Sequence, residues 1–148
     1  ALHLGVVVIV HYYPYTLFIL IVVSWQDFVD NSLVGSGKIC SGAILGQDGS
    51  VWAISPSLKL TPEESQKLCA AFLDPSGIRA EGFRIGGTKY ITIMSTEKEI
   101  YGKAGACGIC CVKTKQAVVV GLYDENTVSG EATKVVGSVA DYFLSVNY

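Results

Sequence analysis

Five short apolar runs between residues 82 and 124 constrain the fold more than any other feature of this sequence. They read "GFRIGG", "TKYITIMS", "EIYGK", "CGICCVKT" and "QAVVVGLYDE", and only short turns rich in Gly, Lys or Glu separate them. Neighbouring parallel strands need a crossover of about a dozen residues or more, which these gaps cannot hold. The spacing therefore predicts an antiparallel meander over this part of the chain.

Segments near residue 24 and at the end of the chain predict helices. In "SWQDFVDNSLVGSG", the apolar residues from Trp25 to Leu33 follow helical spacing, and a glycine at position 35 or 37 can end the helix. In "SGEATKVVGSVADYFLSVNY", one helical stripe contains Val135, Val136, Val139, Tyr142, Phe143 and Val146.

The stretch between these segments predicts a hairpin and another helix. Asp48-Gly49, a strong hairpin signal, lies between two runs rich in β-branched or aromatic residues. A helix begins after Thr61, with Pro62 in its first turn and Glu64 completing a capping box. The whole pattern predicts an α+β fold, a central antiparallel sheet with helices at both chain ends.

Residues 1–23 differ in composition from the rest, because every Asp, Glu, Lys and Arg lies after residue 26. This stretch is long enough to cross a bilayer, which takes about 20 residues. However, it contains His11 and Pro14 in mid-span and lacks the basic start of a secretory signal. An anchor or signal, an added strand or helix, and a segment outside the working protein all stay open. We favour the last and place the single functional domain at residues 24–148.

The composition and the reactive residues favour a protein that is not an enzyme and holds no cofactor or metal. The 11 Lys and Arg against 13 Asp and Glu give a net charge of −2, without global attraction to nucleic acid. Because both histidines precede residue 24, the domain has no imidazole to activate a nucleophile. The stretch "SGKIC" fails the phosphate-loop motif, which requires glycine at Ser32 and Ser or Thr at Ile39.

The cysteines Cys107, Cys110 and Cys111 form a C-x-x-C-C cluster that could bind zinc or act in redox chemistry. A zinc site needs four ligands, whereas Cys40 and Cys69 are isolated on a predicted strand and helix. Along a strand, Cys107 and Cys110 also face opposite sides of the sheet. We interpret the cysteines as buried small hydrophobic residues.

Aromatic residues near both chain ends predict a binding surface. Trp25 and Phe28 lie on the first predicted helix, Trp52 on the second strand, and Tyr142 and Tyr148 near the C-terminus. If the terminal helices lie side by side, these rings can gather, and Tyr148 at the chain end is hard to bury completely. An exposed aromatic cluster suits proline-rich ligands, whose stiff polyproline helix loses little entropy on docking.

Several of these stretches resemble profilin signatures, particularly those of the plant and amoeboid type. "SWQDFVD" is similar to the family's opening Ser-Trp-Gln-x-Tyr-Val-Asp and "AILGQDGSVWA" to its second signature, and "GGTKY", "IYGKAG", "GLYDE" and "ADYF" follow in order. The resemblance covers residues 24–148 and leaves residues 1–23 unmatched. It implies a central antiparallel sheet with the N- and C-terminal helices on one face and smaller helices on the other.

The resemblance also implies a function. Profilins bind monomeric actin on one side and proline-rich segments of actin regulators, such as formins, on another, and so control actin polymerisation in the cytoplasm and cytoskeleton. The polyproline contacts carry over to Trp25, Trp52, Tyr142 and Tyr148. Phe28 replaces the usual tyrosine of that site, which keeps the ring and loses one hydroxyl donor.

The implied actin surface includes the later strands and the start of the last helix. It carries over to Lys89, Lys103, Lys113, Thr127, Val128 and Lys134. Six basic and only two acidic residues lie between positions 84 and 115. The same patch could hold phosphatidylinositol bisphosphate through Arg84, Lys89, Lys103 and Lys115, although Ala104 replaces a lysine common in the family. Without the resemblance, these lysines are typical of a solvated sheet edge.

Two other classes of protein stay open. A longin- or roadblock-like α+β scaffold predicts that Trp25, Trp52, Tyr142 and Tyr148 do not gather. A small-molecule or redox enzyme predicts that the thiols between Cys107 and Cys111 are close together and exposed. The placement of the rings and thiols therefore separates the three hypotheses.

Overall fold

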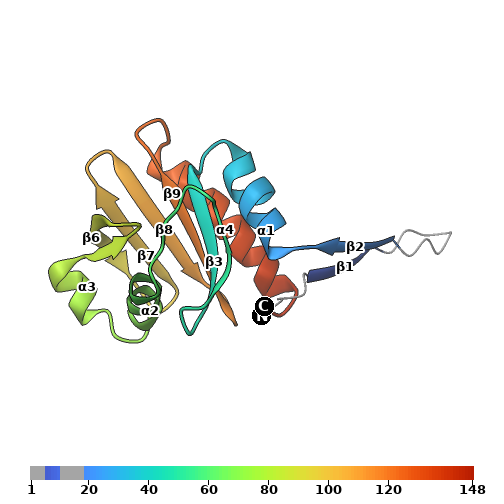
Figure 1. The fold of residues 1–148 in the computed structure, drawn as a ribbon, viewed down its shortest axis with the longest axis horizontal. Helices are drawn as coiled ribbons and strands as arrows, with labels where there is room; N and C mark the ends of the chain where they lie inside the picture. The colour runs from blue at the N-terminus through green and yellow to red at the C-terminus, as the bar shows by residue number, and fades with distance from the viewer. Residues whose placement is uncertain (1–5, 11–18) are drawn as a thin grey trace.

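The structure of the protein is a computed structural model. It describes residues 6–10 and 19–148, with side chains from residue 24 onward. Figure 1 shows a curled sheet with helices on both faces. The strands of this sheet are antiparallel and follow the order β4-β3-β9-β8-β7-β6-β5. Their bounds are β3 Ser41–Gly46, β4 Val51–Ile54, β5 Phe83–Ile85, β6 Thr88–Ser95, β7 Glu99–Ala104, β8 Cys107–Lys113 and β9 Ala117–Tyr123.

The predicted meander is confirmed, because β5 to β9 pair in chain order. The predicted hairpin is confirmed as well, and Gly49 in its turn has φ 91°, a left-handed value that favours glycine. The hairpin joins the meander through β3, which pairs with β9 from Ser41 opposite Leu122 to Gly46 opposite Ala117. This pairing brings the first hairpin beside the last strand.

The first predicted helix is present, but its winding changes along its length. Ser24 caps α1 (Trp25–Asp27) in a capping box with Asp27. A π-helical segment, η1 (Phe28–Leu33), and a 3-10 turn, η2 (Val34–Ser36), follow before Gly37 ends the helix at φ 77°. The sequence pattern predicted one helix and did not predict the wide turn.

The two terminal helices cover one face of the sheet, as expected. Helix α4 (Ser129–Ser145) packs against η1, β8 and β9, and its predicted stripe faces the sheet and the first helix, with Val136 and Phe143 fully buried. A Cβ at Gly121 of β9 would approach Val136 Cγ2 to 2.5 Å. The helix therefore lies directly on the strand backbone at this glycine.

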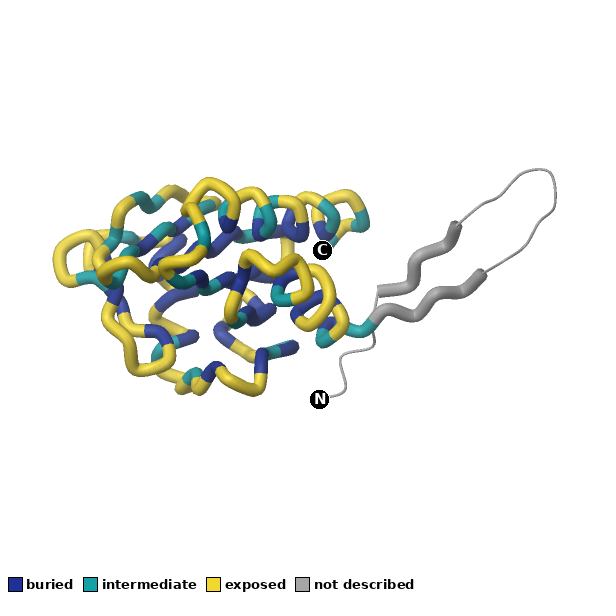
Figure 2. The backbone as a smooth tube through the Cα atoms, turned by 90° about the horizontal axis from the view of Figure 1, so that it is seen from above, coloured by how far each residue is buried: buried dark blue, intermediate teal, exposed yellow. Residues whose placement is uncertain are grey.

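Smaller helices, α2 (Pro62–Ala70) and α3 (Ser76–Glu81), lie over the other face. The predicted capping box of α2 is formed by Thr61 and Glu64. Along β9, Ala117 and Val119 face the core under the terminal helices, while Val118 and Val120 face the core under α2 and α3. Figure 2 shows the buried strands between exposed helical layers.

Part of the N-terminal stretch forms a separate antiparallel pair, β1 (Val6–Val10) with β2 (Ile19–Val23). Figure 1 shows this pair projecting away from the seven-stranded sheet at the start of α1. Of the three interpretations of residues 1–23, the added strand agrees with these two segments, while His11 and Pro14 lie outside the described residues. Within the described part of the chain, we find no helix with both the length and the apolar character that a membrane crossing requires.

The interpretation of the cysteines as buried hydrophobic residues holds for Cys69, Cys110 and Cys111 and is wrong for Cys40 and Cys107, which are exposed. Cys110 and Cys111 face opposite cores. Burial raises the pKa of Cys69 to about 11 and raises the pKa values of Cys110 and Cys111, which disfavours reactive thiolates. The thiols of the cluster thus do not form the close, exposed group that a redox enzyme predicts.

Candidate functional site

The five aromatic residues singled out from the sequence lie together at one end of the terminal helices, and we call them the aromatic surface. The ring centroids of Trp25 and Trp52 are 4.9 Å apart, and those of Trp25 and Tyr148 are 5.1 Å apart. Phe28 and Tyr142 are separated by 5.5 Å. A longin- or roadblock-like scaffold predicted that these rings do not gather, so the geometry disagrees with that hypothesis.

The members of the aromatic surface differ in exposure. Only 3% of Trp25 and 9% of Phe28 is exposed, whereas Trp52, Tyr142 and Tyr148 are half-buried. Trp25 is covered because Trp52 and Tyr148 pack on it and Phe143 meets it edge-on at 5.3 Å. The expectation that the rings share one exposed surface is therefore wrong for Trp25, which lies beneath the others.

Gln26 fixes the first helix against the edge of the sheet, next to Trp52. Its side-chain Nε2 donates to the Ile54 carbonyl at 3.0 Å, and its Oε1 accepts from the Ile54 N–H at 3.3 Å. These bonds satisfy backbone groups of the edge strand β4 two residues beyond Trp52. This role of Gln26 could not be predicted from the sequence, because it depends on a contact between distant segments.

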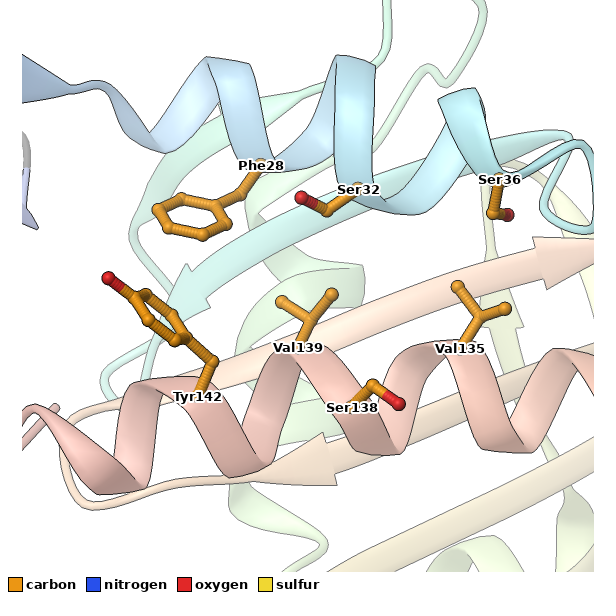
Figure 3. A pocket seen from close by; sticks show the side chains of 7 residues that line it. All are labelled: Phe28, Ser32, Ser36, Val135, Ser138, Val139 and Tyr142. Atoms are coloured by element: carbon orange, nitrogen blue, oxygen red, sulfur yellow. The ribbon is translucent and has the colours of Figure 1, made fainter. Parts of the chain in front are cut away.

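A groove between the two terminal helices continues from the aromatic surface. Its cavity has a volume of about 540 Å³. In Figure 3, the rings of Phe28 and Tyr142 face each other at one end, and Val135 and Val139 point from α4 toward the first helix. The side chains of Ser32, Ser36 and Ser138 add hydroxyl groups along the groove. The groove thus combines apolar surface with a few hydrogen-bonding groups, as peptide-binding sites do.

Basic residues gather on the outer strands, on the sheet face that also carries α4. Arg84 and Lys89 pair directly across β5 and β6, and Lys103 of β7 pairs with Ile91 of β6. Directly paired residues share a face of the sheet, and Lys103 Nζ lies 5.2 Å from the ring centroid of Tyr123, which belongs to the core under α4. We call Arg84, Lys89, Ile91 and Lys103 the outer-strand surface.

The start of α4 borders this surface. Cys110 Sγ lies 3.4 Å from Thr133 Oγ1, which places the first turns of α4 on β8, the strand next to β7. The predicted actin residues Thr127 and Val128 immediately precede α4, and Lys134 lies in its first half. Val128 is 69% exposed, which is unusual for a valine in a folded domain.

Two predicted basic residues lie elsewhere. Lys113 ends β8 and follows Val112, which faces the terminal helices, so Lys113 points to the opposite face of the sheet. Lys115 lies in the turn between β8 and β9 and donates to Asn147 Oδ1 at 2.9 Å. The structure therefore brings together three of the four predicted phosphoinositide ligands, without Lys115, and separates Lys113 from the other predicted actin residues.

Two exposed isoleucines on β6 were not among the predicted site residues. Ile91 and Ile93 are 68% and 64% exposed, whereas Thr92 between them donates to the Ile78 carbonyl under the other face. In the run "TKYITIMS", Tyr90 alternates with Ile91 and Ile93, and successive side chains of a strand point to opposite faces. With Tyr90 buried on one face, the two isoleucines lie on the other. Exposed apolar residues beside lysines are typical of a protein-binding surface.

Comparisons with known proteins agree with this geometry. The sequence profile of the profilin family matches residues 23–148. The chain is 46% identical to profilin from Schizosaccharomyces pombe over 126 residues, which cover 84% of this chain and 99% of that protein. The crystal structure of Acanthamoeba castellanii profilin II has a TM-score of 0.83 at 40% identity and covers 84% of this chain and 100% of that one.

A more distant structure shares the fold. Mouse profilin IIa, solved in complex with a double repeat from the FH1 domain of mDia1, has a TM-score of 0.70 at 21% identity, and the match covers 85% of this chain and 100% of that one. The family profile, the similar relatives and the seven-stranded sheet with both terminal helices on one face lead to one conclusion: this chain belongs to the profilin family.

Proposed function

We propose that this protein binds monomeric actin and proline-rich segments of actin regulators, and so controls actin polymerisation. The observation that supports it best is the gathering of Trp25, Phe28, Trp52, Tyr142 and Tyr148, which come from both chain ends and the first hairpin. Membership of the family and the FH1 segment bound by mouse profilin IIa support the same function. The role requires no catalysis, so we propose a binding protein without enzymatic activity, located in the cytoplasm on the actin cytoskeleton.

The proline-rich segment lies on the aromatic surface in this proposal. Trp52, Tyr142 and Tyr148 contact the ligand with their exposed faces, and the buried Trp25 supports Trp52 and Tyr148. Proline rings stack on aromatic side chains, and a polyproline helix is already extended before it binds. Proline-rich segments of formins are partners of this kind.

The outer-strand surface and the start of α4 bind actin in this proposal. Lys89, Lys103 and Lys134 supply positive charge, and Thr127 and Val128 supply contacts beside them. The exposed Ile91 and Ile93 add apolar area to the same side of the molecule. We leave Lys113 out of this site because its side chain points to the other face of the sheet.

Phosphoinositide binding is a second candidate activity of the outer-strand surface. Arg84 and Lys89 lie directly opposite each other, an arrangement of like charges that an anionic headgroup would stabilise. Lys103 is the third ligand in this proposal. Binding of phosphatidylinositol bisphosphate would then compete with actin, because the two ligands share Lys89 and Lys103.

Two titrations test the main proposal. A proline decamer should change the tryptophan fluorescence in a saturable way, because Trp25 and Trp52 lie within the aromatic surface. Actin monomers should bind the protein in the presence of a saturating concentration of the decamer, since the two surfaces are separate. A protein that shows neither interaction contradicts the proposed function.

A further inference from the structure

The end of α4 places Tyr148 on Trp25 through a Schellman motif. The Tyr148 N–H donates to the Phe143 carbonyl at 2.8 Å, and the Asn147 N–H donates to the Leu144 carbonyl at 3.2 Å. Asn147 has φ 67°, the left-handed conformation that this motif requires. The motif satisfies the Phe143 and Leu144 carbonyls and leaves the Tyr148 ring on Trp25, with the two ring centroids 5.1 Å apart.

Three more hydrogen bonds hold this terminus, and all of them come from the turn between β8 and β9. Lys115 Nζ donates to Asn147 Oδ1 at 2.9 Å, and Gln116 Nε2 donates to the Asn147 carbonyl at 3.1 Å. The Gln116 N–H donates to the Tyr148 carbonyl at 2.9 Å. The final residues of a domain are usually poorly ordered unless they are tied down, and these bonds tie down the last two.

Asn147 suits the left-handed position of the Schellman motif. Glycine is the usual residue there, and asparagine is the less common choice that tolerates the conformation. Asn147 adds a side-chain oxygen that accepts the bond from Lys115, which glycine could not do. Asn147 therefore serves both the helix end and the contact with the turn.

We infer that Lys115, Gln116 and Asn147 form a C-terminal clamp that positions Tyr148 for proline-rich ligands. The clamp acts through Tyr148. The turn between β8 and β9 therefore influences the affinity for proline-rich ligands, although none of its residues is one of the five rings. The helix end holds the Tyr148 backbone through its N–H, and the turn holds it through its carbonyl. The inference rests on the proposed proline binding and adds positioning residues to that site.

The first test uses the full chain and a proline decamer, with tryptophan fluorescence as the readout. The combined variant Lys115→Met and Gln116→Leu removes both side-chain donors and keeps the Gln116 N–H, and we expect the decamer to bind about threefold to tenfold more weakly. Lys115→Arg keeps a donor and should restore most of the affinity lost in Lys115→Met. Lys98→Met, a matched change at an exposed lysine in the neighbouring turn, should leave the affinity unchanged.

A double-mutant cycle shows whether the clamp acts through Tyr148. In a Tyr148→Ala background, Lys115→Met and Gln116→Leu should have no further effect on the affinity, because the ring that they position is absent. Without ligand, the same two changes should shift the indole N–H signal of Trp25 in NMR spectra, since Tyr148 packs on that ring. Thermal unfolding of each variant separates these effects from loss of the fold.

The outcomes distinguish the inference from the proposed function. A parent protein that does not bind the decamer overturns both. A parent that binds, together with a clamp variant that binds equally well, overturns the clamp alone. An equal loss of affinity with and without the Tyr148 ring also overturns it, because the turn would then act on the ligand by another route.

Discussion

The aromatic surface and the outer-strand surface are built in opposite ways. The aromatic surface takes rings from residues 25, 28, 52, 142 and 148, and its central ring is 97% buried, since only 3% of Trp25 is exposed. The outer-strand surface takes its side chains from three consecutive strands, and its members Lys89 and Ile91 are exposed. A change at the buried ring of the aromatic surface should therefore affect both ligand binding and stability. A change at an exposed residue of the outer-strand surface should affect ligand binding alone.

The largest expected effect comes from Trp25→Ala. The ring belongs to the core under the terminal helices, so its removal should lower the free energy of unfolding by about 3–5 kcal/mol and abolish proline binding with it. Urea unfolding measures the first effect and fluorescence from Trp52 the second. Lys89→Ala, at an exposed residue of the other surface, is the control and should change stability by no more than about 0.5 kcal/mol. An unchanged urea midpoint in Trp25→Ala would show that the ring is not part of the core.

Charge reversal should separate the two surfaces. The combined variant Lys103→Glu and Lys134→Glu should weaken actin-monomer binding by about tenfold or more, because it replaces two positive charges on one side of the molecule. Proline binding should stay the same, and sedimentation with labelled actin measures the difference. Lys113→Glu is a matched control, since Lys113 points to the opposite sheet face and should leave both activities intact. Equal loss of both activities in a folded double variant would contradict the proposed division.

A smaller effect should follow from Phe28→Tyr. The Phe28 ring lies 5.5 Å from that of Tyr142 and lines the groove between the terminal helices, but it has no hydroxyl group to offer a ligand carbonyl. The added donor should strengthen proline binding by about threefold to tenfold, which corresponds to roughly 0.5–1.5 kcal/mol. Calorimetric titration with a proline decamer measures this change. Weaker binding would mean that the hydroxyl does not reach the ligand.

The smallest effect is expected from removal of residues 1–23. Ser24 already supplies the N-cap of α1, and the described strands β1 and β2 form a sheet separate from the seven-stranded one. We therefore propose that residues 24–148 form the functional domain and bind actin and proline-rich ligands as well as the full chain does. Aggregation or a much lower melting temperature of the truncated protein would show that the N-terminal strands stabilise the fold.

Much of the fold follows from local features of the sequence. The gaps between residues 82 and 124 are too short for parallel crossovers, and β5 to β9 form the expected meander. Asp48-Gly49 and the Thr61 capping box act within four residues of chain, so they form in the structure where the sequence predicts them. The apolar stripe of the last helix likewise identified its buried face, including Val136 and Phe143.

The tertiary structure decided the features that depend on distant contacts. Pairing of β3 with β9 and the bonds from Gln26 to Ile54 bring Trp52 to Trp25, and close packing buries Trp25 that the sequence placed on an exposed surface. The direction of Lys113 depended on strand register, which a single pair of neighbouring residues does not specify. The place of Lys115 depended on the contact of its turn with Asn147, which is distant in the sequence. The sequence alone therefore determined most of the helices and strands between residues 24 and 148, because their signals act over a few residues, but it did not locate α3 or the pair of β1 with β2. Only packing decided which of the five rings a ligand can touch, because exposure depends on every segment that folds over a side chain.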